Sequence, residues 1–152
     1  MKLKKGIVGG WNVKEELVKS SSNVSQFKNS LYPIEYSGTR SYKVIGFKDD
    51  IGVQNYYRLS ILDKSENSTL DILINSMYPY YCGVVADSYN EFIHLPAEII
   101  SFADSTFSYL SPLELNSRFH ESDLTELNES ELKEIKYWGA KTFGEIIFND
   151  WD

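Results

Sequence analysis

The sequence predicts an α+β fold in which an antiparallel β-sheet, a meander, is followed by a C-terminal helical segment. Between residues 41 and 86, β-branched and aromatic residues occur in short runs separated by turn-forming residues, as in consecutive strands. After Pro96, apolar residues recur every three or four positions, as on one face of a helix. The length of 152 residues favours one domain, with a weakly patterned start (1–40), a mainly β part (41–95) and a mainly α part (96–152).

The weakly patterned start contains one helix candidate. Asn12 is a favourable N-cap, and residues 13–18 that follow it are compatible with a short helix. The glycine-containing stretch 6–10 lacks both the dinucleotide-binding spacing and the Lys-Ser/Thr ending of a phosphate loop. We therefore expect it to be a flexible turn.

Four strands are predicted in the middle of the chain. Residues 41–47 and 53–62 form a hairpin through the turn at 49–52. A third strand alternates apolar and polar side chains over 70–75, and a fourth covers 81–86. Because polar and apolar positions alternate, we expect a meander with one face in water.

Capping signals divide the helical part. A short helix begins at Pro96. Asn128 and Glu131 form a capping box that starts a helix, Gly139 ends it, and a second box, Thr142 with Glu145, starts the closing helix. We expect apolar stripes to face the core in both helices: Leu132, Ile135 and Trp138 in the first, and Phe143, Ile146, Ile147 and Trp151 in the second.

Composition excludes several classes of protein. Fifteen Lys and Arg residues against 22 Asp and Glu residues give a net charge of −7, which disfavours a nucleic-acid-binding protein. No window approaches the roughly 18 apolar residues of a membrane span, and the start lacks the apolar core of a secretory signal. We expect a soluble protein of the cytoplasm. The single cysteine, Cys82, excludes an internal disulfide.

The chemistry-bearing residues make a weak case for an enzyme. Cys82 and His94 are an available nucleophile and base, but no catalytic signature surrounds Cys82, and its apolar neighbours are typical of an inert buried thiol. His120, Glu121 and Asp123 lack the second imidazole of a zinc motif, so we expect no metal and no cofactor. A small enzyme or ligand-binding domain, using Cys82 and His94 or a pair of carboxylates, is the alternative to a non-enzymatic binding protein.

The tyrosines allow two interpretations. There are 11 of them, several in or beside the predicted strands, where tyrosine packs well. The alternative is an interface, because tyrosine provides a large contact area at a low cost in entropy.

The clearest functional signal is an uneven distribution of charge. Residues 61–152 carry 17 acidic and five basic residues. A negative surface attracts a basic protein partner and can stand in for the phosphates of a nucleic acid. Seven acids between residues 114 and 134 are the predicted partner-binding residues: Glu114, Glu121, Asp123, Glu126, Glu129, Glu131 and Glu134.

The last 18 residues read Ile-Lys-Tyr-Trp-Gly-Ala-Lys-Thr-Phe-Gly-Glu-Ile-Ile-Phe-Asn-Asp-Trp-Asp. This stretch resembles the tail Y-W-x-P-x-T-x-G-E-I-I-F-N-x-W-D of small bacterial immunity proteins of polymorphic toxin and contact-dependent inhibition systems. Ala140 stands where that tail has proline. The resemblance implies a cytoplasmic inhibitor that binds a cognate toxin domain, often a basic nuclease, and that is not an enzyme.

Overall fold

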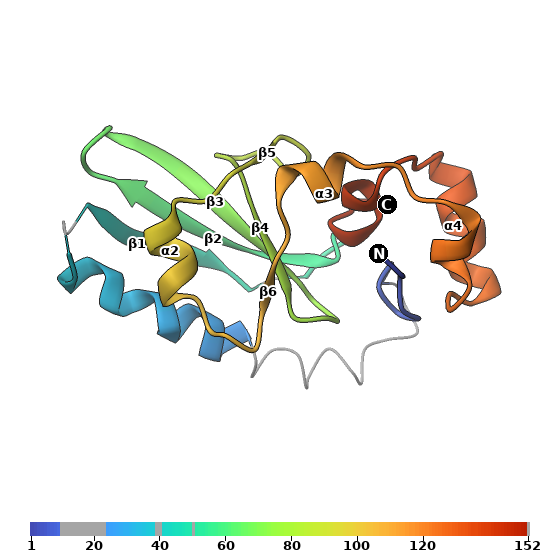
Figure 1. Ribbon diagram of the computed structural model, residues 1–152, viewed down its shortest axis with the longest axis horizontal. Helices are drawn as coiled ribbons and strands as arrows, with labels where there is room; N and C mark the ends of the chain where they lie inside the picture. The colour runs from blue at the N-terminus through green and yellow to red at the C-terminus, as the bar shows by residue number, and fades with distance from the viewer. Residues whose placement is uncertain (10–23, 39–40, 50, 152) are drawn as a thin grey trace.

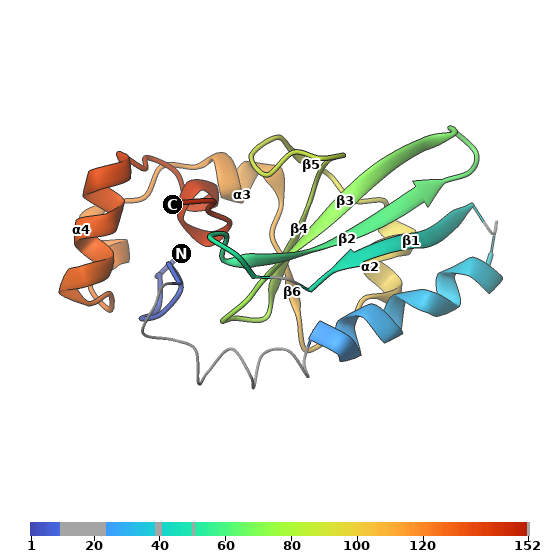
Figure 2. The ribbon, with the colours of Figure 1, turned by 180° about the vertical axis from the view of Figure 1, so that it is seen from behind.

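The chain forms a β-sheet with other elements packed on both of its faces, as the computed structural model shows (Figures 1 and 2). The structure describes residues 1–9, 24–38, 41–49 and 51–151. The predicted helix at 13–18 and its cap Asn12 lie outside these residues. The expected fold class is confirmed: an antiparallel-dominated sheet is followed by C-terminal helices.

The predicted meander forms, and two short strands extend it. Its first four strands are neighbours in sequence order and antiparallel. β5 pairs with β4 antiparallel and β6 pairs with β4 in parallel, which the sequence analysis did not anticipate. The strands are β1 (Tyr42–Lys48), β2 (Tyr56–Asp63), β3 (Ser68–Asn75), β4 (Tyr80–Val85), β5 (Phe92–Ile93) and β6 (Ser108–Tyr109). β2 begins three residues later than predicted, because Val53 lies in the connection and is 53% exposed.

The helices are short, and most begin with a cap that the sequence specifies. Residues 24–31 are α-helical and continue into a 3₁₀ turn, η2 (Tyr32–Tyr36). The later elements are α2 (Ala97–Phe102), α3 (Pro112–Asn116), the 3₁₀ turn η3 (Glu121–Leu124), α4 (Glu129–Trp138) and α5 (Phe143–Ile147). Both predicted capping boxes are present, and Gly139 ends α4 in the left-handed conformation that glycine tolerates.

One face of the sheet is buried by the helix at 24–31 and by α2. Phe27 is fully buried there and packs against Tyr81 of β4, with ring centroids 4.8 Å apart. Tyr57, Leu59 and Ile61 of β2 belong to the same cluster, because alternate residues of a strand share one face. Glu35 of η2 also accepts a hydrogen bond from the backbone N–H of Val44 in β1 (3.2 Å), which protects the edge strand.

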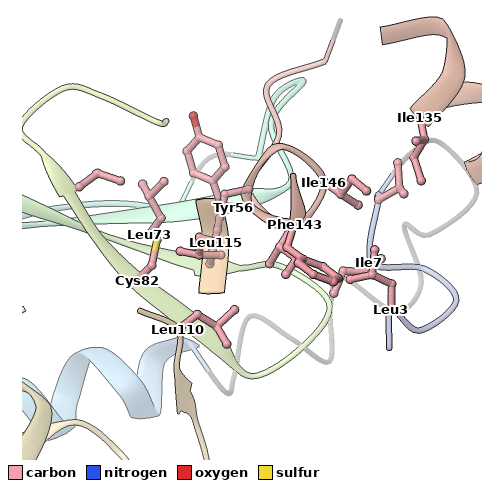
Figure 3. Packing of buried hydrophobic residues seen from close by; sticks show 14 of the residues in the cluster. Leu3, Ile7, Tyr56, Leu73, Cys82, Leu110, Leu115, Ile135, Phe143 and Ile146 are labelled. Atoms are coloured by element: carbon pink, nitrogen blue, oxygen red, sulfur yellow. The ribbon is translucent and has the colours of Figure 1, made fainter. Parts of the chain in front are cut away.

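The other face of the sheet was expected to lie in water, and for much of its area this was wrong. Tyr56, Leu73 and Cys82 belong to a second buried cluster with α3, α5 and the first residues of the chain (Figure 3). Leu115 of α3 and Phe143, Ile146 and Ile147 of α5 belong to this cluster and cover that part of the second face. A strand with polar residues at alternate positions can still be buried on both faces where a helix covers it.

A buried ion pair lies on this second face. Arg58 donates to Asp71 on the neighbouring strand at 2.6 Å, and the two side chains are 13% and 3% exposed. Asp71 also accepts the backbone N–H of Asp87 (2.9 Å). The alternating pattern of β3 predicted that the carboxylate of Asp71 faces solvent. It is instead buried, where an ion pair and a hydrogen bond compensate for its lost hydration.

A network of three buried asparagines, the asparagine network, joins the ends of the chain to the sheet. Asn55, Asn75 and Asn149 are each 2–3% exposed. Asn149 donates from Nδ2 to the carbonyls of Val8 (2.9 Å) and Ile146 (3.0 Å), and its N–H donates to Asn55 Oδ1 (2.8 Å).

The other two asparagines extend these contacts. Asn55 Nδ2 donates to Ile7 (2.9 Å), and Asn75 Nδ2 donates to Ile147 (2.6 Å). The stretch that was expected to be a flexible turn is, where described, part of the core: Ile7 and Val8 are buried.

The apolar stripes of the last two helices are only partly as predicted. Ile135 is buried, but Leu132 and Trp138 are each 40% exposed. α5 ends at Ile147, so Trp151 is not on its face; it is half-buried and stacks on Trp138, with centroids 6.2 Å apart and planes 10° from parallel. Phe148 ends the helix because its backbone leaves the helical conformation.

We predict that Asn149→Ala lowers the free energy of unfolding by about 1–3 kcal/mol. The carbonyls of Val8 and Ile146 each lose the shorter of their two amide hydrogen bonds inside the core and keep only the bond from Asn55 Nδ2 (3.3 Å). Urea unfolding measures the effect. Asn149→Asp, which keeps the shape but cannot donate, should lose at least as much. The exposed Asn116→Ala is the control and should stay within about 0.5 kcal/mol of wild type. Equal losses in both alanine variants would contradict the network.

We predict a loss of stability at alkaline pH that depends on Tyr81. Burial, with a smaller contribution from Tyr109, raises the pKa of Tyr81 to about 12, whereas an unfolded tyrosine titrates near 10. The contribution of neutral Tyr81 to the free energy of unfolding is fully present below about pH 10. It is lost as the pH rises to about 12, by about 1.4 kcal/mol per pH unit.

Urea unfolding between pH 8 and 12 tests this prediction. Tyr81→Phe should be less dependent on pH than wild type by that amount. Burial also raises the pKa values of Tyr42, Tyr56 and Tyr109. Tyr42 and Tyr56 contribute equally in both proteins, whereas the interaction between Tyr109 and Tyr81 is lost in the variant and is part of the measured difference. Identical pH dependence of wild type and variant would show that Tyr81 ionises normally.

Candidate protein-binding surface

The predicted acidic residues lie along the segment from α3 through η3 to α4. Five of the seven are exposed: Glu114, Glu121, Glu126, Glu129 and Glu134. Asp123 is half-buried, and Glu131 is buried. The short elements carry these acids because acids suit the first turn of a helix: Glu114, Asp123 and Glu131 each occupy the third position of a capping box.

The N-terminal residues fold back onto this acidic segment, which the sequence analysis missed. The backbone N–H of Leu3 donates to the carbonyl of Asp123 (2.8 Å). The amino group of Met1 lies 3.8 Å from the carboxylate of Asp123, and Lys2 lies 3.9 Å from Glu126. The segment is therefore less negative than its own composition indicates. The sequence does contain a signal for this contact: the first residues of the chain are rich in lysine, and they attract the acidic segment.

Glu131 is not available to a partner. It is 5% exposed, and its carboxylate accepts the backbone N–H groups of Gly6 (2.7 Å), Val8 (3.4 Å) and Asn128 (3.0 Å). The prediction that all seven acids form a contact surface is wrong for this residue. Its role is to fasten the start of the chain to α4, because a carboxylate is a strong acceptor for several N–H groups at once.

The exposed acids differ in their surroundings. Glu129 pairs with Lys133 at 3.1 Å, one turn along α4. Glu134 accepts the indole N–H of Trp138 at 3.1 Å. Glu121 forms no ion pair with any described residue. Of the exposed acids in this segment, Glu134 is the one that accepts a hydrogen bond from an exposed aromatic side chain.

Three aromatic residues gather at the C-terminal end of α4, and we call them the aromatic corner: Tyr137, Trp138 and Trp151. Trp138 stacks on Trp151, and Tyr137 meets Trp138 edge to face, with centroids 5.3 Å apart and planes at 85°. Tyr137 is 81% exposed. Large aromatic side chains in this state provide contact area without the cost of ordering a flexible chain.

The residues proposed for catalysis are not brought together in a usable state. Cys82 lies on β4, the strand between β3 and β5, and its side chain is fully buried. Burial raises the pKa of its thiol well above the ordinary value. His94 is exposed in the segment that follows β5. The structure gives the cysteine–histidine alternative no support, because the thiol is buried and its raised pKa disfavours the nucleophilic thiolate.

Among the residues that the structure describes, no three His, Cys, Asp or Glu side chains gather as a metal site would require. In the same part of the chain, no helix has the length and apolar character needed to cross a membrane. A cavity of about 290 Å³ lies away from the acidic segment, between the start of the helix at 24–31, the β3–β4 connection and the approach to β6. Its lining residues are Val24, Gln26, Asn75, Met77, Tyr78, Pro79, Thr106 and Phe107.

Comparison with known proteins gives no relative: no family model, no curated protein and no solved structure matches the chain. The function is therefore argued from the geometry of the described residues.

We predict that Glu131→Ala destabilises the protein by about 1.5–3 kcal/mol, because buried N–H groups lose a charged acceptor. Glu131→Gln, which keeps one acceptor oxygen, should lose less. Glu129→Ala is the matched control from the same helix, because its side chain is 84% exposed. Urea unfolding gives the energies, and amide exchange at Gly6 should accelerate only in the Glu131 variants. Equal effects of Glu129→Ala and Glu131→Ala would contradict this role.

Proposed function

We propose that this chain is a cytoplasmic immunity protein that binds a cognate bacterial toxin domain, such as a basic nuclease, and inhibits it without chemistry of its own. The observation that supports this most is the combination of exposed carboxylates from Glu114 to Glu134 with exposed aromatic side chains at the end of α4. Interfaces between proteins use such aromatic residues as energetic centres and use charge to select the partner.

The mechanism is steric and electrostatic occlusion. The carboxylates attract a basic surface and orient it during the encounter, and they compete with the phosphates that a nuclease would bind. Neutralisation of part of the acidic segment by Met1 and Lys2 limits the long-range attraction. Affinity then depends mostly on short-range contacts, for which the aromatic corner offers exposed aromatic side chains beside the acidic segment.

The proposal is tested first in cells. A toxin domain is sought at the C-terminal end of any large effector encoded by the neighbouring gene. That domain is expressed with and without this chain, and growth is measured. Protection together with a stable one-to-one complex of the purified proteins supports the proposal. Growth arrest that persists when this chain is present in excess would refute it.

Charge reversal tests the electrostatic part. We predict that Glu121→Lys with Glu126→Lys slows association with the toxin domain by about tenfold or more at low ionic strength, and that salt reduces the difference. Stopped-flow fluorescence measures the rate.

The control for charge reversal is Glu66→Lys with Glu91→Lys. It changes the net charge equally, from exposed residues of the β2–β3 and β4–β5 connections. If the control slows association as much as the test variant, the acids at 121 and 126 are not the steering surface.

A further inference from the structure

The aromatic corner is held in a defined arrangement although it is exposed. Trp151 follows the asparagine network by two residues, and its ring lies parallel to that of Trp138. Glu134 holds the indole N–H of Trp138 from one turn earlier in α4. Tyr137 is fixed at its edge against Trp138 but remains 81% exposed. The rings therefore present faces that need no rearrangement before contact.

The corner is electron-rich in three ways. Aromatic faces carry partial negative charge and attract cations. The C-terminal end of α4, at Trp138, carries the negative end of the helix dipole. Glu134 adds a full negative charge: its Oε2 accepts the indole N–H, and no described residue bonds its Oε1.

No cation of the chain occupies these faces among the described residues. The cation–π contacts among the described residues are made by Lys28 and Arg58, and both lie on other parts of the molecule. Lys133, one turn before Tyr137, is held by Glu129 at 3.1 Å. The corner thus combines the features of a cation site with an open position for a cation.

We infer that the aromatic corner receives an arginine side chain from the protein partner. The guanidinium group stacks flat on the exposed face of Tyr137 and donates to Oε1 of Glu134. Arginine fits better than lysine because a planar guanidinium both stacks on a ring and presents several N–H groups in one plane, whereas an ammonium is compact and strongly hydrated. The inference rests on the proposed function, since it names the contact that a basic partner would make.

The inference can be tested without the toxin. The probe is a short capped peptide, acetyl-Gly-Arg-Gly-amide, and its matched control carries citrulline, which has nearly the same shape but no charge. A third peptide carries lysine. The chain is titrated with each peptide, and the indole N–H signals of Trp138 and Trp151 are followed by NMR. We expect saturable shifts of these two signals with the arginine peptide and weaker binding of the other two.

Variants locate the site. Tyr137→Ala should weaken binding of the arginine peptide about two- to fivefold, the effect of one exposed cation–π contact. Glu134→Gln removes the charge and keeps an acceptor for the indole, and should also weaken binding. Tyr36→Ala, at a tyrosine that is 79% exposed elsewhere, and Glu91→Gln, at an exposed acid outside the acidic segment, are the controls and should leave binding unchanged.

The inference is overturned if citrulline or lysine binds as well as arginine, if the shifts do not saturate, or if Tyr137→Ala and Tyr36→Ala behave alike. Its failure is distinguishable from failure of the proposed function. Saturable, arginine-selective binding by a chain that gives no protection against the toxin would refute the function and leave the site. Protection by a chain whose corner shows no such selectivity would refute the site alone.

Discussion

Hydrogen bonds from buried asparagine amides hold the two ends of this chain against one end of its sheet. Asn149 bonds to Val8 from the N-terminal segment and to Asn55 before β2, while Asn75 bonds to Ile147 of α5. Each amide has both a donor and an acceptor to satisfy, so it specifies its neighbours more narrowly than an apolar side chain does. The placement of the C-terminal helices, and with them the acidic segment, depends on this network.

The distinctive sequence of the tail also has structural reasons beyond Asn149. Most of its residues are used internally: Thr142 and Glu145 cap α5, and Ile146 and Phe148 fill the core. Gly144 lies so close to Phe92 that a side chain would collide with that ring. The aromatic residues of the tail that reach solvent are Tyr137, Trp138 and, partly, Trp151. The same string thus builds a fold element and exposes the surface to which we assign partner contact.

Local signals were sufficient for the order and type of most elements. Alternation located β3, and capping boxes located the starts of α4 and α5, because these signals act over a few residues. The burial of Asp71 and Glu131 was not predictable in this way. Both carboxylates are satisfied by groups that are distant in sequence or on another strand, Arg58 for one and Gly6 for the other. For the same reason, sequence identified the acids of the candidate surface but not the amino group of Met1 and the side chain of Lys2 that fold onto them.

The central claim is that the partner binds on the side of the molecule formed by η3, α4 and the end of the tail. Hydrogen–deuterium exchange of the chain, alone and in complex with the toxin domain, tests it most directly. The account predicts that binding slows exchange over residues 121–138 and around Trp151. Slowed exchange confined to the helix at 24–31, to α2 or to β1 would contradict it.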